Sequence, residues 1–230
     1  MKIAFSVIGL ALLGLLLPLI FSARNLPTDS PPPNQNLPWQ IALDAQGNST
    51  VLGLTLGQST LADVRQRLGE DMEIAIVAAP EEVGELEAYY SQAAFGPVLG
   101  KVIFTLDTTP EMLAAMRERA AKAEYMESST KKIRLNPDDL AHANTLPIRA
   151  IGLIPNANLD ETTILQRFGP PKTRITVGKT LTHFLYPHLG LDVVLDAQGK
   201  DVLQYVAPQN FEARIVAPLV AAQAKQPSPQ

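Results

Sequence analysis

The chain has 230 residues, no cysteine and a formal net charge of −4, with acidic and basic residues interspersed. This length is enough to bury a core in one domain or in two small ones. Without cysteine, thiol catalysis, thiolate metal sites and a lipoprotein-type lipid anchor are excluded. No basic stripe is present, which argues against nucleic acid as a partner.

The amino-terminal segment predicts export. Residues 3–21 carry no charge and approach the ~20 residues needed to cross a bilayer. Cleavage after Ser22 or Ala23 would place a bulky residue at the −3 position, which signal peptidase disfavours. We therefore favour residues 1–24 as an uncleaved anchor in the cell membrane, with the rest of the chain on the periplasmic side. The alternative is a cleaved signal peptide and a soluble periplasmic protein.

Composition then divides the exported part. Residues 25–38 contain five prolines and predict a stiff, extended linker. The folded part begins at Trp39, with a first unit over residues 39–128 and a second over 129–215. Residues 216–230 are rich in Ala, Gln and Pro and predict a mobile tail.

In the first unit, two strands are expected around a turn, followed by a short helix that a hydroxyl residue caps. Gly69 ends this helix in an expected left-handed turn. Three strands follow, and then a central helix begins at Thr108-Thr109-Pro110-Glu111. The expected strands cover residues 40–44, 49–56, 73–78, 86–92 and 98–107, and the helices 59–68 and 109–125.

The second unit follows the same plan. A short strand and a helical turn lead to an apolar strand, a capped helix that Gly169 ends, and four short strands. The expected strands cover residues 132–135, 148–154, 173–177, 181–186, 191–195 and 202–206, and the helical segments 137–140 and 160–168. The fold class is α+β: two related units of helix and antiparallel strands with an extra central helix.

Two internal echoes suggest duplication. Gln66-Arg67-Leu68-Gly69 recurs as Gln166-Arg167-Phe168-Gly169, there followed by two prolines. Leu43-Asp44-Ala45-Gln46-Gly47 recurs as Leu195-Asp196-Ala197-Gln198-Gly199. We interpret both as remnants of one small α/β unit used twice.

A helix ending in apolar-Gly-Pro, followed by a strand meander with a Tyr and an Asp-x-x-Gly turn, resembles the BamE/SmpA/OmlA envelope proteins and the related β-lactamase inhibitor proteins. The similarity is best over residues 158–206, in Asp160–Pro171, Phe184–Pro187 and Leu191–Gly199. The first unit lacks the proline pair. This resemblance implies a protein-binding role without catalysis. The whole chain also resembles uncharacterised exported proteins of pseudomonads and their relatives.

No catalytic, cofactor or metal residues are expected. His183 and His188 are five residues apart and lack a third ligand at a metal-binding spacing. No Gly-x-Ser-x-Gly or glycine-rich phosphate loop occurs. Exposed aromatic residues beside an acidic loop are the better binding signal, and the expected interaction surface consists of Tyr89, Tyr90, Glu85, Glu87 and Tyr186.

The expected function is a membrane-tethered envelope protein, held in the membrane through residues 3–21, whose domain is a non-catalytic interaction or assembly module for another envelope protein. One alternative is a carrier of a small ligand or lipid in an apolar cavity. Another is a hydrolase with a non-standard site, which requires a cleft with convergent ionisable groups.

Overall fold

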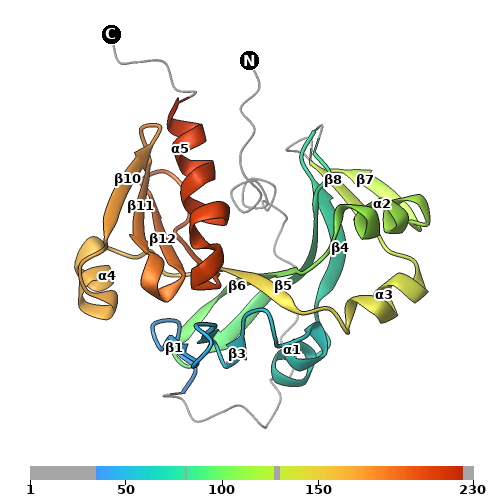
Figure 1. Ribbon diagram of the computed structural model, residues 1–230, viewed down its shortest axis with the longest axis horizontal. Helices are drawn as coiled ribbons and strands as arrows, with labels where there is room; N and C mark the ends of the chain where they lie inside the picture. The colour runs from blue at the N-terminus through green and yellow to red at the C-terminus, as the bar shows by residue number, and fades with distance from the viewer. Residues whose placement is uncertain (1–34, 81, 127–129, 225–230) are drawn as a thin grey trace.

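A ten-stranded antiparallel sheet dominates the computed structural model, which describes residues 35–80, 82–126 and 130–224 (Figure 1). The strand order is β10-β11-β12-β13-β9-β6-β5-β4-β8-β7. The α+β class is thereby confirmed. The strands are β4 (Glu73–Ala78), β5 (Glu85–Phe95), β6 (Val98–Leu106), β7 (Lys122–Tyr125), β8 (Lys131–Arg134), β9 (Ile148–Pro155), β10 (Thr173–Val177), β11 (Leu181–Tyr186), β12 (Leu191–Asp196) and β13 (Val202–Val206).

Five α-helices accompany the sheet in this part of the chain: α1 (Leu61–Leu68), α2 (Pro110–Glu118), α3 (Pro137–Ala143), α4 (Glu161–Phe168) and α5 (Ala217–Ala224). Short helical turns occupy Pro187–Leu189 and Pro208–Asn210, and a π-helix occupies Glu212–Val216. Within the described ranges, no helix has the length and apolar character that crossing a bilayer requires. The expected membrane segment, residues 1–24, lies outside these ranges.

The linker expected over residues 25–38 is described only from residue 35, and its end belongs to the fold. Leu37 is buried, and the Tyr205 hydroxyl donates a hydrogen bond of 3.0 Å to the Pro38 carbonyl. Residue 39 is therefore not the boundary of the folded part, because the preceding two residues already contact the core.

A small sheet forms ahead of α1 from β1 (Ala42–Leu43), β2 (Ser49–Val51) and β3 (Leu54–Thr55). The single strand expected over residues 49–56 is therefore wrong. Leu52 and Gly53 form a two-residue hairpin turn in which both have positive φ, 55° and 75°. Leucine rarely adopts this conformation, and here its side chain is fully buried, which compensates the strain.

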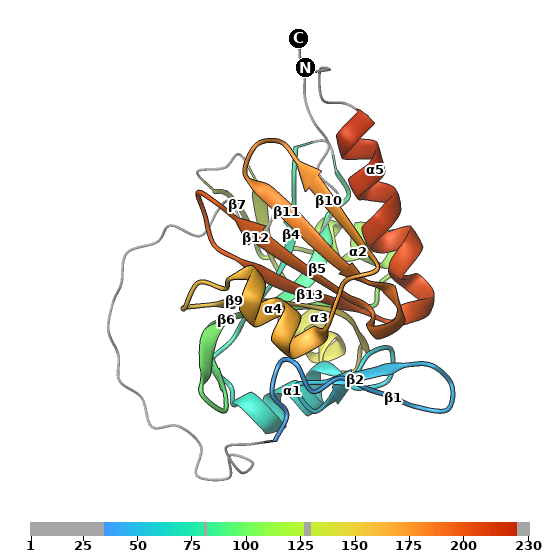
Figure 2. The ribbon, with the colours of Figure 1, turned by 90° about the vertical axis from the view of Figure 1, so that its left-hand side faces the viewer.

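The two faces of the large sheet are covered differently (Figures 1 and 2). Alternate residues of each strand point to opposite faces. On one face, the main core joins strand residues such as Phe104, Ile151 and Tyr205 to Val64 of α1 and Ile164 of α4. On the other face, α5 and the π-helix before it cover the β10–β13 end of the sheet.

Helices α1 and α4 end in the same way, at positions one hundred residues apart. Gly69 has φ 88° and ψ −174°, and Gly169 has φ 75° and ψ −168°. This is not the expected left-handed turn but an extended conformation with positive φ that is open almost only to glycine. On the second strand after each helix, a tyrosine hydroxyl donates to that glycine's carbonyl: Tyr90 at 2.7 Å and Tyr186 at 2.9 Å.

The second echo reflects local turn chemistry. The Asp44 carboxylate accepts a hydrogen bond from the Gln46 amide, and the Asp196 carboxylate accepts one from the Gln198 amide. Each Asp thus closes an Asx-turn between antiparallel strands. One turn precedes α1, whereas the other follows α4 and its strands. The two turns do not occupy corresponding places, so this echo does not support duplication.

The expected central helix over residues 109–125 ends earlier, at Glu118. Thr109 caps its start, accepting a hydrogen bond from the Met112 amide. After the helix, the Arg119 guanidinium pairs with Asp139 at 2.7 Å and turns the chain back toward the sheet. Residues 122–125 then form the edge strand β7 on β8.

A helix replaces much of the mobile tail expected from residue 216. The π-helix and α5 continue to Ala224, and Phe211 and Ile215 are buried against Ala150, Leu185 and Val206 of the sheet. At the far end of α5, the Gln223 amide donates to the Thr176 carbonyl of edge strand β10 at 3.1 Å. The helix thus covers part of one sheet edge.

Candidate binding site

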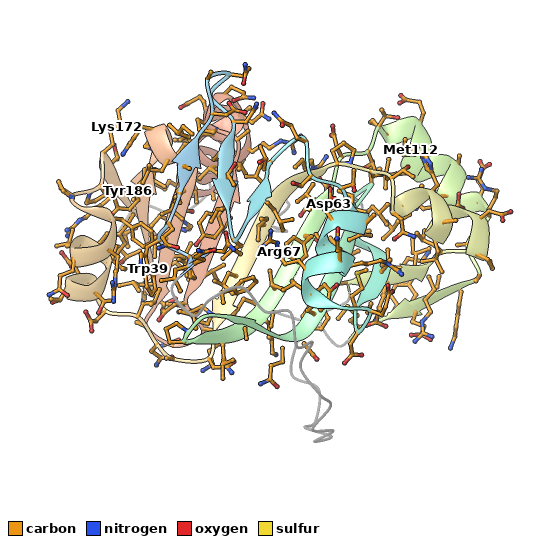
Figure 3. All side chains as sticks on the ribbon, turned by 90° about the horizontal axis from the view of Figure 1, so that it is seen from below. Trp39, Asp63, Arg67, Met112, Lys172 and Tyr186 are labelled. Carbon is orange, nitrogen blue, oxygen red and sulfur yellow. The ribbon has the colours of Figure 1, made fainter. Side chains whose placement is uncertain are left out.

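The expected interaction surface is not exposed as a unit. Tyr90 and Tyr186 are 2% and 0% exposed and belong to the main core, where each holds a helix end (Figure 3 labels Tyr186). Tyr89 is half-buried, and burial together with the nearby charge of Glu73 raises its pKa to about 12. The aromatic part of the prediction is therefore corrected, since two of its three tyrosines have structural roles.

Glu85 and Glu87, the acidic residues of the expected surface, instead line a cavity of about 380 Å³, a volume typical of small-molecule sites. It lies between the β4–β5 loop, the first turn of α2 and strand β9. We call it the Glu87 cavity; its walls are Val77, Ala79, Glu82, Val83, Gly84, Glu85, Glu87, Thr108, Pro110, Leu113, Thr130 and Arg149.

Glu87 is the most unusual residue of this cavity. It lies mid-strand in β5, between Ala75 of β4 and Thr105 of β6, and is 7% exposed. Among the described residues its carboxyl group has no hydrogen-bond or ion-pair partner. Burial alone raises the pKa of Glu87 to about 8, so this group is mostly a neutral acid at pH 7.

Arg149 and Glu85 form an ion pair at the wall of the cavity, with side chains 10% and 13% exposed. Thr105 pairs with Ala150 and Leu106 with Ile148, so Arg149 is the unpaired residue of a β-bulge. Bulges redirect a side chain, and this one turns Arg149 toward Glu85. Burial and the nearby charge of Arg214 lower the pKa of Arg149 to about 10, which leaves it charged.

The rim of the cavity is tied to α2. The Arg117 guanidinium donates a hydrogen bond of 2.6 Å to the Val83 carbonyl. Gly84 has φ 86°, and a Cβ there would lie 2.6 Å from the Val77 carbonyl oxygen. A glycine is therefore required where the loop passes close to β4. In Figure 3, Met112 marks α2, whose first turn borders the cavity.

Comparisons with protein-family models, with curated proteins and with solved structures gave no match. The chemistry of the site is therefore read from its own residues. Three glutamates and one arginine line the Glu87 cavity, and the arginine is already paired. The Thr108 hydroxyl is buried without a hydrogen-bond partner among the described residues. The remaining described wall is mostly apolar and includes one further polar residue, Thr130.

The described ranges hold no group of three or more His, Asp or Glu placed to bind a metal ion. His183 pairs instead with Asp192: its Nδ1 lies 2.8 Å from the Asp192 carboxylate, and both side chains are buried. Burial raises the pKa of Asp192, and the hydrogen bond from His183 opposes this shift. The Nδ1 of His183 is therefore occupied by the contact with Asp192.

Reasoning from sequence placed Glu85 and Glu87 in one patch but missed what makes it a cavity. Arg149, Thr108 and the start of α2 come from segments distant in the chain. One signal was present: Arg149 is the only charged residue in the apolar strand β9. A charge in such a strand indicates a buried partner or a site.

Proposed function

We propose that this protein is tethered to the cell membrane through residues 3–21 and that its domain, on the periplasmic side, is a non-catalytic interaction or assembly module for another envelope protein. The proposal includes duplication: two related units, one built on α1 with β4–β6 and the other on α4 with β10–β12. A cleaved signal peptide and a soluble periplasmic domain are the alternative.

One observation supports the two-unit construction above the others. In both halves a helix ends at a glycine of the same unusual conformation, and a buried tyrosine two strands later binds that glycine's carbonyl. In the sheet, β4-β5-β6 lie on one side of β9 and β10-β11-β12 on the other. The last strand of each set, β6 or β12, is the one nearest to β9. The tandem unit is the feature by which the chain resembles the BamE-like and β-lactamase inhibitor proteins, which bind other proteins.

A photo-crosslinking amino acid in intact cells tests the interaction role. Suitable positions are Tyr125 on edge strand β7 and Leu99 on β6, because both side chains are exposed, at 77% and 44%. We expect one envelope protein to be captured on irradiation and identified by mass spectrometry. A matched position is Ile76, which is fully buried and should capture nothing. Failure of both exposed positions to enrich any protein above the non-irradiated sample contradicts the proposal.

The Glu87 cavity favours a second candidate function, the binding of a small ligand. Its volume is suited to a small molecule, and its walls combine apolar side chains with an unpaired buried carboxyl. The cavity also contains the ionisable groups that the hydrolase alternative requires. Binding without turnover supports a carrier, whereas release of a product from a bound compound supports a hydrolase.

A further inference from the structure

We propose that the Glu87 cavity binds an alkylammonium group, with the carboxylate of Glu87 as its counter-ion and the apolar wall around its carbon chain. This inference rests on the second candidate function and names the ligand class. The inference does not depend on the identity of the protein partner, which the crosslinking experiment tests at Tyr125 and Leu99.

The charge of the cavity selects a cation. Of the described residues that line the cavity, Arg149 alone is cationic, and it is paired with Glu85. Glu82 and Glu87 remain as carboxyl groups without an ion pair among the described residues. Once Glu87 is ionised, an anionic ligand would meet a like charge, whereas a cation stabilises the ionised carboxylate.

The charged groups around Glu87 leave it unpaired. On β4, Glu73 pairs with Lys132 of β8, and on β9, Arg149 pairs with Glu85. The facing residue of β6 is Thr105, which carries no charge. Arg117 at the rim donates to the Val83 carbonyl, and Arg214 lies near Arg149. Among the described residues, none of these cations forms an ion pair with Glu87. A ligand's ammonium group would supply the missing partner of Glu87.

The shape and polarity of the wall define the rest of the ligand. Val77, Val83, Pro110 and Leu113 offer apolar contacts suited to a short carbon chain. The unpartnered hydroxyl of Thr108 can accept a hydrogen bond from an ammonium N–H. The three glutamates of the wall are not among any described group of carboxylates placed to hold a metal ion, which disfavours a bare divalent cation.

Binding must be coupled to a proton. Burial holds the pKa of Glu87 at about 8 in the empty cavity, so an ammonium ion that binds the carboxylate displaces a proton from it. Affinity should therefore increase as pH rises toward the pKa of Glu87. With a pKa of about 8, linkage gives an increase of about 50-fold between about pH 6 and about pH 8.

Calorimetric titration of the full-length protein, purified in mild detergent, with n-butylammonium chloride tests this inference. We expect binding with release of about one proton and the pH dependence given above. Glu87→Gln should reduce the affinity at least about tenfold at alkaline pH and abolish the pH dependence. Glu118→Gln, which removes the same charge from the exposed face of α2, should change neither.

Three results would overturn the inference: no binding by the wild-type protein, equal binding by Glu87→Gln, or preference for n-butyrate over n-butylammonium. A readout on the wild-type protein avoids dependence on the folding of the variant. Addition of n-butylammonium near pH 7 should move the ¹³C resonance of the Glu87 carboxyl to its ionised position. An unmoved resonance contradicts the proposal even if the variant does not fold.

The source of the ammonium group is resolved by a second probe, Nα-acetyl-lysine methylamide. Tighter binding than n-butylammonium identifies a lysine side chain of a protein, and weaker binding identifies a free amine. Partner capture from Tyr125 and Leu99 should be the same in Glu87→Gln cells. Absence of amine binding by the wild-type protein, with partner capture retained, would refute this inference alone.

Discussion

Tyr90 and Tyr186 show how one hydroxyl group can hold a helix end. Each donates to the carbonyl of a partly buried glycine at the end of the helix. A carbonyl without this donor would be poorly hydrated in the folded state. The two tyrosines are far apart in sequence but perform the same task, so their removal should have the same consequence.

We expect Tyr90→Phe and Tyr186→Phe each to lower the free energy of unfolding by about 1–2 kcal/mol, because each leaves a glycine carbonyl without its donor. Urea denaturation monitored by circular dichroism measures the change. Tyr125→Phe is the matched control, since Tyr125 is 77% exposed, and it should shift stability by less than about 0.5 kcal/mol. A large loss at one tyrosine and none at the other would argue against equivalent units.

Glu87 gives a pH dependence with a definite sign. Its pKa in the folded protein, about 8, is above the usual 4.5, so folding favours the protonated form. The associated stability is fully present below about pH 4.5 and is lost as pH rises toward about 8. Between these limits the wild-type protein should lose on the order of a few kcal/mol relative to Glu87→Gln.

Urea denaturation of both proteins at several pH values measures this difference. We expect the two unfolding free energies to be closest at acidic pH and Glu87→Gln to be the more stable protein at alkaline pH. Parallel pH profiles would mean that the Glu87 carboxyl ionises freely in the folded state.

At the scale of elements, the carboxyl-terminal helix was the largest difference from the sequence prediction. Residues 216–224 are mostly Ala, Val, Leu and Gln, without a polar cap or a clear charged face. The composition of residues 216–224 therefore resembles that of a mobile chain terminus. What stabilises the helix is tertiary packing of Phe211, Ile215 and Leu219 on the sheet, which no local signal reveals.

Ile215→Ala should lower the free energy of unfolding by about 2–4 kcal/mol, because the side chain is 3% exposed and its removal leaves a cavity under the helix. Val220→Ala is the control, since Val220 lies on the same helical segment but is 51% exposed. Hydrogen exchange should show protected amides through α5 in the wild-type protein. Equal effects of the two substitutions would show that the helix does not pack as described.

The elements that sequence predicted well carry strong local signals. Helix α4 begins at Asp160, whose carboxylate accepts a hydrogen bond from the Thr163 amide, and ends at Gly169. The sequence of β6 is rich in β-branched and apolar residues, which favour a strand. The features that sequence did not predict depend on contacts between distant segments. Strand β7 pairs with β8, and the bulge in β9 places Arg149 beside Glu85 at the cavity wall. The sequence of one segment alone does not predict its pairing with a distant segment.

At the scale of the whole molecule, β9 joins the two proposed units. It pairs with β6 of the first and with β13 of the second, so the sheet is continuous. The main core also extends across both halves, from Ile76 to Tyr186. Neither half can therefore unfold without exposing core residues of the other.

This continuity predicts one cooperative unfolding transition. Scanning calorimetry should show a single peak whose calorimetric and van't Hoff enthalpies agree. Tyr90→Phe and Tyr186→Phe should shift that same peak, although they lie in different halves. Two separable peaks, each sensitive to one substitution, would contradict a single folding unit.

The proposed amine site is built on one group, the unpaired and buried Glu87 carboxyl on the wall of the cavity. Its pKa can be measured directly from the pH titration of the Glu87 carboxyl ¹³C resonance in the full-length protein. We predict a pKa of about 8 without ligand and a lower value in the presence of n-butylammonium. A pKa near 4.5 that n-butylammonium leaves unchanged would contradict the account.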